Sequence, residues 1–505
     1  MSTIKRTIIL SVLLLSALSS YSCLRLPIPE ESVPIVKPTW EFNPSWTLPV
    51  LEINTENGDS ILSKETYIPG KCSFYSKEGA KEEEMGLQIR GRGNSSWKQF
   101  EKKPYKIKLN SKYQMANGGK SKHYVLLPFA TSGLAYWDNL VGFELSRRIG
   151  LEWTPSMQPY ELILNGDYQG LYFLTENIRI EKDRVNITQQ ENGENDPQNI
   201  TGGWLLEIDN YVENNQIYLK DREDKTIRVT YHTPDSLSEA QKVYLEDYLN
   251  KVNETTQTQD INDDRWENYI DIDEMVKYYI VQELMDNPEA FAGSCWFHKD
   301  RGENAKIKFG PIWDLDACYY WRDYPQWITD FVVLGIRYKQ RWLTEIIKHP
   351  HFQETIQKHW TSFQGLTEIR GFVEQKGEEL LTAAELDHIR WPQYSETFTK
   401  ESMEMFLERY NGKVDFLQSN WNYPSKIQGV EVSRPHAVVA SNRINFCGYE
   451  EEVHDVKIIG LDGMKYNIAK INANEYVVQD NKGLAILQYT VCGNQVSEKI
   501  VIPAN

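Results

Sequence analysis

Cysteine is scarce in this sequence, with six residues among 505. Apart from Cys23, near the N-terminus, five remain: Cys72, Cys295, Cys318, Cys447 and Cys492. An odd number of thiols cannot all pair. Cys447 and Cys492 share a β-rich region, where a disulfide is compatible with an oxidising compartment. Cys295 and Cys318 are interpreted as small buried hydrophobic residues. No spacing of cysteine and histidine is typical of a zinc site.

Positive charge is also in deficit, with 55 Lys and Arg against 72 Asp and Glu and a net charge of -17. An acidic surface argues against nucleic acid or an anionic membrane as the main partner. A local basic pocket for a nucleotide remains compatible with this balance.

Long apolar runs are missing after the N-terminus. There, Lys5 and Arg6 precede an apolar stretch (7–18) and small residues that end at Cys23. This order predicts a secretory signal. The cysteine after Ser22 is typical of lipoprotein processing, so we expect a signal peptide over 1–23 and a lipid on Cys23. The protein would then be anchored in the cell envelope, at the outer membrane or cell surface. Ordinary cleavage near Ser22 is the alternative. The proline-rich residues 24–45 predict an extended tether.

The length of the chain predicts more than one domain. Alternating strands dominate residues 46–110, a helix is expected over 135–149, and a hairpin closed by Asn-Gly-Asp over 160–174. Residues 340–420 are mostly helical in pattern. From about residue 425 the period changes to two, which predicts a small antiparallel, immunoglobulin-like sandwich over 425–505. We therefore expect an α+β domain of two lobes over 46–422, followed by an all-β domain.

Two carboxylates, Asp314 and Asp316, follow an alternating strand at residues i and i+2. On an extended backbone both side chains point to the same side. Oxygen ligands of this kind suit Mg²⁺ or Mn²⁺. A solvated strand end is the plain alternative.

A turn rich in Gly and Arg lies far upstream and contains Arg92, Gly93, Asn94 and Ser95. Such a turn is suited to lie over phosphates. Together with the two carboxylates it suggests phosphoryl transfer in the manner of protein kinases, with Mg²⁺ or Mn²⁺ as the metal.

Several segments, in this order, resemble the spore coat protein H (CotH) kinase family. They are Arg-Gly-Asn-Ser-Ser-Trp (92–97), Lys-Lys-Pro-Tyr-Lys-Ile-Lys-Leu (102–109), Glu-Leu-Ser-Arg-Arg-Ile-Gly-Leu (144–151), Leu-Asn-Gly-Asp-Tyr-Gln-Gly-Leu-Tyr-Phe-Leu-Thr-Glu (164–176), Gly-Gly-Trp-Leu-Leu-Glu-Ile-Asp (202–209) and Phe-Gly-Pro-Ile-Trp-Asp-Leu-Asp (309–316). The resemblance covers roughly residues 48–415. It implies an atypical protein kinase fold, secreted or at the cell surface, that binds ATP with a divalent metal.

The resemblance also implies roles for single residues. Asp314 looks like the metal-binding aspartate, with Asp316 beside it. Lys106 or Lys108 looks like the strand lysine that reaches the phosphates, and Glu144 would pair with it. Arg92, Gly93, Asn94 and Ser95 belong to the turn beside the phosphates, and Glu176 lies in a segment that would be the hinge near adenine. The plain alternatives are a solvated strand face for the lysines and a charge on the helix surface for Glu144.

One departure concerns the catalytic base. Where the family has an aspartate after Gly-Asn-x, this chain has Glu289, and Asp286 replaces the glycine. A base must come within hydrogen-bonding reach of the attacking hydroxyl, and Glu is one methylene longer. Asp286 is the second candidate. The sequence therefore leaves three functions open. They are a kinase that phosphorylates itself or an unidentified secreted or surface protein, an inactive nucleotide-binding scaffold or adhesion lipoprotein, and a glycan-associated lipoprotein.

Overall fold

The computed structural model describes residues 41–130, 135–318, 342–394 and 400–421, and seven stretches of the C-terminal region: 436–440, 443–447, 453–460, 463–472, 475–479, 483–491 and 494–502. The predicted signal peptide (1–23) and most of the stretch 24–45 lie outside these residues, as do Cys492 and the side chain of Cys447. The chain forms two compact units, residues 1–423 and 424–505, and each is described by itself.

The first unit begins with a closed barrel of seven strands in the order β1-β2-β3-β4-β5-β7-β6. Neighbours are antiparallel except β1 and β6, which close the barrel in parallel. The strands are β1 (Val50–Thr55), β2 (Ile68–Tyr75), β3 (Lys81–Gly91), β4 (Tyr105–Gln114), β5 (Lys120–Leu127), β6 (Met157–Leu164) and β7 (Asp167–Glu176).

Alternation along the strands places apolar side chains inside the barrel. On β4, Tyr105, Ile107 and Leu109 are buried, whereas Lys106 is half-buried and Lys108 exposed. The β6–β7 hairpin turns at Asn165 and Gly166, which have φ of 53° and 83°, as a two-residue turn of this hand requires. The two lysines therefore share the outer face of the barrel.

A second sheet has the strand order β12-β11-β8-β10-β9. Its strands are β8 (Trp204–Asp209), β9 (Gln216–Lys220), β10 (Thr226–Thr233), β11 (Cys295–Lys299) and β12 (Ile307–Phe309). Cys295 is fully buried here and Cys318 nearly so, which confirms their interpretation as small core residues. Helix α4 (Glu239–Thr256) lies against β9, and α5 (Ile272–Leu284) packs against β12.

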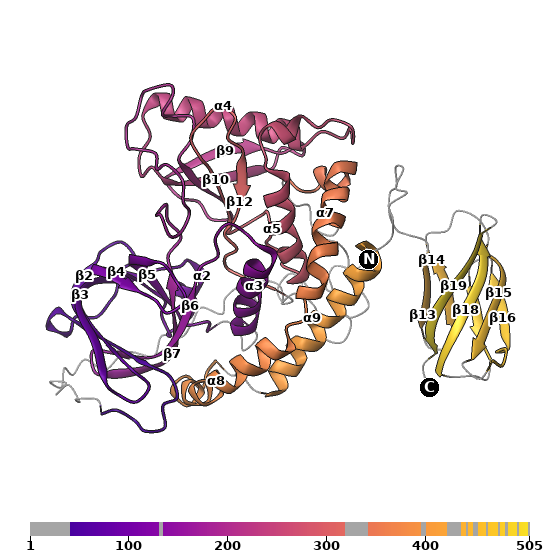
Figure 1. Ribbon diagram of the computed structural model, residues 1–505, viewed down its shortest axis with the longest axis horizontal. Coiled ribbons are helices and arrows are strands. Elements are labelled where there is room, and N and C mark those ends of the chain that lie inside the picture. Colours follow the sequence, from indigo (N-terminus) through magenta and orange to yellow (C-terminus); the bar gives the residue numbers. More distant parts are fainter. Residues whose placement is uncertain are drawn as a thin grey trace, which may run out of the picture. The chain divides into compact units, whose positions relative to one another are not determined.

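Helix α5 is buried along almost its whole length and contacts α3 (Ala135–Ile149), α7 (Pro350–Phe363) and α9 (Lys400–Trp421). Asp271 caps its N-terminus by accepting a hydrogen bond from Glu274 N at 3.1 Å. Figure 1 shows α3 between the barrel and α5, while α8 (Arg370–Arg390) runs below the barrel strand β7. The short helical elements are α2 (Ser95–Gln99), η1 (Glu56–Gly58), η2 (Arg265–Asn268), η4 (Ile346–Lys348) and η5 (Gln364–Leu366).

The second unit contains a four-stranded sheet, β13-β14-β17-β16, and a three-stranded sheet, β15-β18-β19. One hydrophobic core draws on both sheets, with Phe446 and Tyr476 from the first and Leu487 and Ile500 from the second. The strands are β13 (His436–Ala440), β14 (Arg443–Cys447), β15 (His454–Gly460), β16 (Ile468–Asn472), β17 (Glu475–Val478), β18 (Gly483–Val491) and β19 (Asn494–Ile502).

The α+β class predicted from the sequence is confirmed by these elements. No helix in the described part of the chain is long and apolar enough to cross a membrane.

Candidate functional site

The Asp314-Leu315-Asp316 segment follows β12 in an irregular stretch. We expected an extended backbone here, and that expectation was wrong, because β12 ends at Phe309 and Asp314 has a left-handed φ of 59°. Asp314 is exposed, Leu315 is fully buried and Asp316 is half-buried. Ser294 Oγ donates to Asp314 Oδ2 at 3.0 Å. The buried leucine thus anchors the segment while Asp314 stays accessible.

Asn139 of α3 also binds this segment. Its Nδ2 donates to Asp316 Oδ1 at 2.7 Å, and its Oδ1 accepts from Leu315 N at 3.2 Å. The neighbouring Asp138 is buried, and burial and the charge of Asp316 raise the pKa of its carboxyl well above the ordinary value.

Arg92 of the barrel lies near these carboxylates, and Lys106 lies near Arg92. The Arg92 guanidinium lies 5.8 Å from the centroid of the Trp313 ring. Burial lowers the pKa of Arg92, and the charges of Asp314, Asp316 and Glu207 oppose that shift. Lys106, on the outer face of β4, has a pKa lowered to about 8 by burial and then by the positive charges of Arg90, Arg92 and Arg179. Arg92 therefore lies beside Asp314 and Asp316, and it connects them to a cluster of positive charge on the barrel that includes the half-buried Lys106.

Further carboxylates approach Asp314 from the second sheet and from the turn after α5. Burial raises the pKa of Glu289, and the charges of Asp314 and Asp209 raise it further. Burial also raises the pKa of Glu207, and the charges of Asp209 and Asp314 raise it further. The hydrogen bond between Glu207 Oε2 and His232 Nε2, at 2.7 Å, acts in the opposite direction. Among the described residues, no hydrogen bond or ion pair holds the Glu289 carboxylate. Glu289 is thus partly buried, its carboxylate interacts with the charge of Asp314, and it is not paired with another described side chain.

Asp286 lies in a different environment. It is 3 % exposed, and its Oδ1 is 3.1 Å from Lys413 Nζ, which also binds Glu283 Oε1 at 2.5 Å. Lys413 and Glu283 are fully buried. The alternative that Asp286 supplies the base is not supported by this geometry, because its carboxylate balances a buried lysine in the core.

Glu144 does not make the predicted ion pair with a strand lysine, and that prediction was wrong. Its carboxylate binds Arg148 Nε at 2.8 Å and lies 3.8 Å from Arg147 NH1, both on its own helix. Among the described residues no ion pair joins Glu144 to Lys106 or Lys108. The i, i+4 spacing on α3 favours the local partner.

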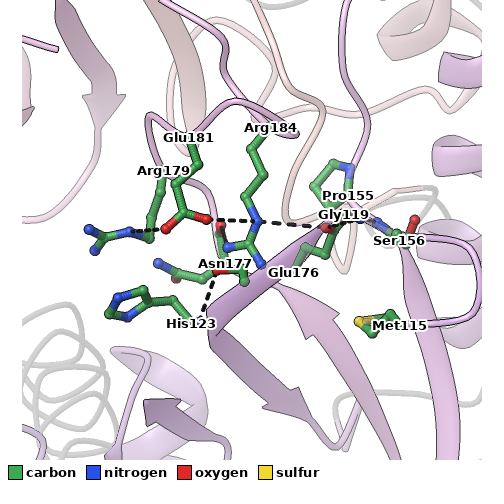
Figure 2. A network of polar contacts seen from close by, with 12 residues as sticks. Met115, Gly119, His123, Pro155, Ser156, Glu176, Asn177, Arg179, Glu181 and Arg184 are labelled. Atoms are coloured by element: carbon green, nitrogen blue, oxygen red, sulfur yellow. Dashed lines mark hydrogen bonds and ion pairs between the residues drawn. The ribbon is translucent and has the colours of Figure 1, made fainter. Parts of the chain in front are cut away.

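The Glu176 carboxylate is also held by contacts within the protein (Figure 2). Its Oε1 accepts from Gly119 N at 2.8 Å, its Oε2 accepts from Ser156 N at 3.0 Å, and Arg184 Nε lies 3.6 Å away. The backbone of Asn177 is engaged as well, since its N donates to His123 O at 3.4 Å and its O accepts from Arg184 NH1 at 2.6 Å. The expected adenine hinge therefore has its polar groups occupied within the protein.

The turn beside β3 carries the remaining predicted residues. Gly93 has a φ of 82°, which favours glycine. Asn94 precedes α2 and accepts from Lys64 Nζ at 2.9 Å, and Ser95 is exposed. Lys108 is exposed two residues along β4 from Lys106. The turn thus brings Arg92 close to the carboxylates. Among the described residues, no hydrogen bond or ion pair joins Gly93, Asn94 or Ser95 to Asp314 or Asp316.

The family model of the CotH kinase protein matches residues 89–420. The chain belongs to the CotH kinase family. No curated protein matches the sequence. The family match begins in β3, so this CotH kinase family member completes its barrel with β1 and β2, which lie outside the matched residues.

Membership of a kinase family implies the use of ATP and a divalent metal. The residues present fit a metal ion that is bound partly by the protein and partly by the phosphates of the nucleotide. Within the described ranges no group of three or more His, Cys, Asp or Glu side chains could hold a metal ion alone. Mg²⁺ commonly takes only one or two carboxylates and completes its shell with waters and substrate phosphates. Asp314 and Asp316 provide two such carboxylates next to Arg92, which suits that kind of site.

Sequence reasoning missed four residues of this CotH kinase family member that surround the site: Asn139, Glu207, Asp209 and Ser294. Glu207 and Asp209 repeat the i, i+2 acidic spacing on β8, and this second pair was a usable signal in the sequence. Asn139 carried no such signal, because its importance depends on contacts with residues far away along the chain, and Ser294 was notable only as a position where the family often has Asn.

Proposed function

We propose that this protein is an atypical protein kinase that transfers the γ-phosphate of ATP, with Mg²⁺ or Mn²⁺, to itself or to surface proteins. The observation that carries the proposal is the convergence of opposite charges beside Asp314. Arg92 comes from the barrel, with Lys106 close to it on β4, Asp316 comes from the same segment, and Glu289 comes from the turn after α5.

In this proposal Arg92 and Lys106 bind the phosphates, and Asp314 and Asp316 supply oxygen ligands to the metal. A metal bound there would neutralise charge on the phosphates during transfer. The half-buried position of Lys106 supports this role, since a cation with little solvent around it interacts strongly with an incoming anion. Lys108 is the weaker candidate because it is exposed.

Glu289 is proposed as the general base. A base works best when its pKa lies near the working pH, and burial and Asp314 raise the pKa of Glu289 toward that range. Its carboxylate has no hydrogen bond or ion pair among the described residues, so it is free to accept the proton of a substrate hydroxyl.

The finer fold and the location belong to the same proposal. The barrel would be the smaller lobe of a kinase-like domain, and the second sheet with its helices the larger lobe. The two sheets of residues 425–505 would form an immunoglobulin-like sandwich. Lipidation of Cys23 would anchor the protein in the cell envelope, which agrees with the basic and apolar N-terminal sequence.

A second candidate function is an inactive nucleotide-binding scaffold or adhesion lipoprotein. Two observations favour it. Glu289 stands where the resemblance leads us to expect aspartate, and Glu144 is paired with Arg148 rather than with a lysine of the barrel. Both features would lower phosphoryl transfer without preventing nucleotide binding.

The test is self-labelling of the purified protein with γ-labelled ATP and Mn²⁺ or Mg²⁺. If Glu289 is the base, Glu289→Gln lowers transfer by about 10²-fold or more, the usual contribution of a positioned proton acceptor, while ATP binding persists. Glu289→Asp retains or raises activity. If the wild-type protein and Glu289→Asp both bind ATP but label neither themselves nor added proteins, the scaffold function is supported instead.

A further inference from the structure

The side-chain amide of Asn139, on helix α3, binds the Asp314-Leu315-Asp316 segment. Asn139 Nδ2 donates to Asp316 Oδ1 at 2.7 Å, and Asn139 Oδ1 accepts from Leu315 N at 3.2 Å. The amide therefore contacts two consecutive residues, one through its side chain and one through its backbone. This arrangement fixes both the path of the backbone and the direction of the Asp316 carboxylate.

Gly142 provides a second, independent contact with the same segment. It lies three residues after Asn139, on the same face of α3. A Cβ atom at Gly142 would collide with Leu315 Cδ1 and would lie 3.6 Å from Met285 Cγ. Leu315 is fully buried in this position. The close approach of the segment to α3 therefore depends on the absence of a side chain at Gly142.

A third contact lies beside Asp314 on its N-terminal side. The rings of Phe143 and Trp313 have centroids 6.1 Å apart and an interplanar angle of 31°. Residues 139, 142 and 143 of α3 thus contact residues 313, 315 and 316, and they leave the side chain of Asp314 exposed. The left-handed backbone of Asp314 costs free energy for a residue with a side chain, and these contacts help to hold it.

We propose that α3 is the positioning element of the candidate metal site, with Asn139 and Gly142 as its positioning residues. This inference rests on the proposed function for the assignment of Asp314 and Asp316 as metal ligands. The contacts from α3 order the segment before the cation arrives, so that little conformational entropy is lost on binding. Without them the carboxylates sample more positions and bind the metal less tightly.

The first test is Asn139→Leu, which keeps a similar side-chain size and removes both hydrogen bonds. Hydrogen exchange of a peptide spanning 312–318 is measured without ligand, and Mn²⁺ binding in the presence of ADP is measured by electron paramagnetic resonance. We expect exchange at Leu315 to accelerate at least about tenfold and Mn²⁺ affinity to fall about tenfold, as loss of a preorganising contact typically causes. Ser146→Ala is the matched control on α3, because the Ser146 hydroxyl is buried and has no hydrogen-bond partner among the described residues. It should leave both measurements unchanged.

The second test is independent of Asn139. Gly142→Ala should displace Leu315 and lower Mn²⁺ affinity, and the double variant Gly142→Ala/Leu315→Ala should recover part of that affinity, because it removes the colliding methyl groups. A purely structural role would give no such rescue, since Leu315→Ala alone only loses buried contacts.

The outcomes separate this inference from the proposed function. Unchanged exchange in Asn139→Leu overturns the positioning role, and so does unchanged Mn²⁺ affinity in a folded Gly142→Ala variant. If Asn139→Leu fails to fold, the Mn²⁺ affinities of Gly142→Ala and of the double variant Gly142→Ala/Leu315→Ala decide whether α3 positions the segment. If the wild-type protein binds no Mn²⁺ with ADP, the proposed metal site fails and the inference is overturned with it, although the exchange measurement still shows whether α3 holds the segment.

Discussion

Replacing Lys106 by methionine should stabilise the protein and weaken its binding of ATP. The pKa of Lys106 is lowered from 10.5 to about 8 by burial and by the nearby Arg90, Arg92 and Arg179. A shift of this size corresponds to about 3 kcal/mol of cost for holding the charged form in the folded protein, at about 1.4 kcal/mol per pKa unit. Methionine has a similar length and carries no charge, so the variant avoids this cost.

The sign of the effect depends on pH. The folded-state pKa is depressed, so between about pH 8 and pH 10.5 the unfolded chain binds more protons than the folded protein. The cost of Lys106 is therefore fully present below pH 8 and disappears as the pH approaches 10.5. Lys106→Met should melt at a higher temperature than the wild-type protein at pH 7, and the difference should shrink at pH 9.5.

Nucleotide binding should respond in the opposite direction. A charge-assisted hydrogen bond is worth about 1.5–3 kcal/mol, so loss of the ammonium should weaken ATP binding by roughly 10- to 100-fold at pH 7. In the wild-type protein ATP binds the protonated lysine, and with a pKa of about 8 the affinity should fall about tenfold between pH 7 and pH 9. Lys106→Arg stays protonated in this range and should lose that pH dependence.

Isothermal titration calorimetry with Mg²⁺ and ATP at pH 7 and pH 9, together with thermal melts, checks these expectations. Lys112→Met is the matched control, because Lys112 lies on the same strand and is exposed. The reasoning is refuted if Lys106→Met binds ATP as tightly as the wild-type protein, or if it melts at a lower temperature at pH 7.

Three further predictions follow from other parts of the structure. Asp314→Ala should abolish the Mg²⁺- or Mn²⁺-dependent part of nucleotide binding while the melting temperature stays within a few degrees, because the side chain is exposed; unchanged metal-dependent ATP affinity would contradict its role. Lys413→Met should lower the free energy of unfolding by about 3–5 kcal/mol, since it leaves the carboxylates of Glu283 and Asp286 buried without their shared cation; the exposed pair of Lys251 and Asp247 is the control, and Lys251→Met should change stability by less than about 1 kcal/mol. Truncation after Tyr423, at the boundary between the two compact units, should leave a soluble protein that binds ATP, and insolubility or loss of ATP binding would show that the units depend on each other.

The local structure of this protein can be largely predicted from its sequence. The helix expected over 135–149 is α3, and the hairpin expected over 160–174 is formed by β6 and β7 around Asn165-Gly166. Alternation predicted strands within residues 46–110 and several strands of the C-terminal sheets, but not β5, β14 or β19. Such features depend on periodicity and turn residues within a few positions of one another, and these are visible in one sequence.

The closure of the barrel and the partners of the charged residues were decided by the tertiary structure. Asn139 and Asp316 are 177 residues apart, and Lys413 and Asp286 are 127 residues apart. No local pattern relates residues at such distances. The motifs therefore suggested functional roles for Asp286, Glu144 and Glu176, whereas the structure gives each of them partners within the protein.

The sequence by itself determined the α+β class, the family and the presence of Asp314, Asp316, Arg92 and Lys106 in its motifs. Only the tertiary structure decided which of the two strand lysines is half-buried among other cations, and which carboxylate near α5 has no hydrogen bond or ion pair with another described residue. The physical reason is that burial and charge pairing depend on what surrounds a side chain in space. A lysine on a strand is an ordinary solvated charge until the fold places Arg90, Arg92 and Arg179 around it.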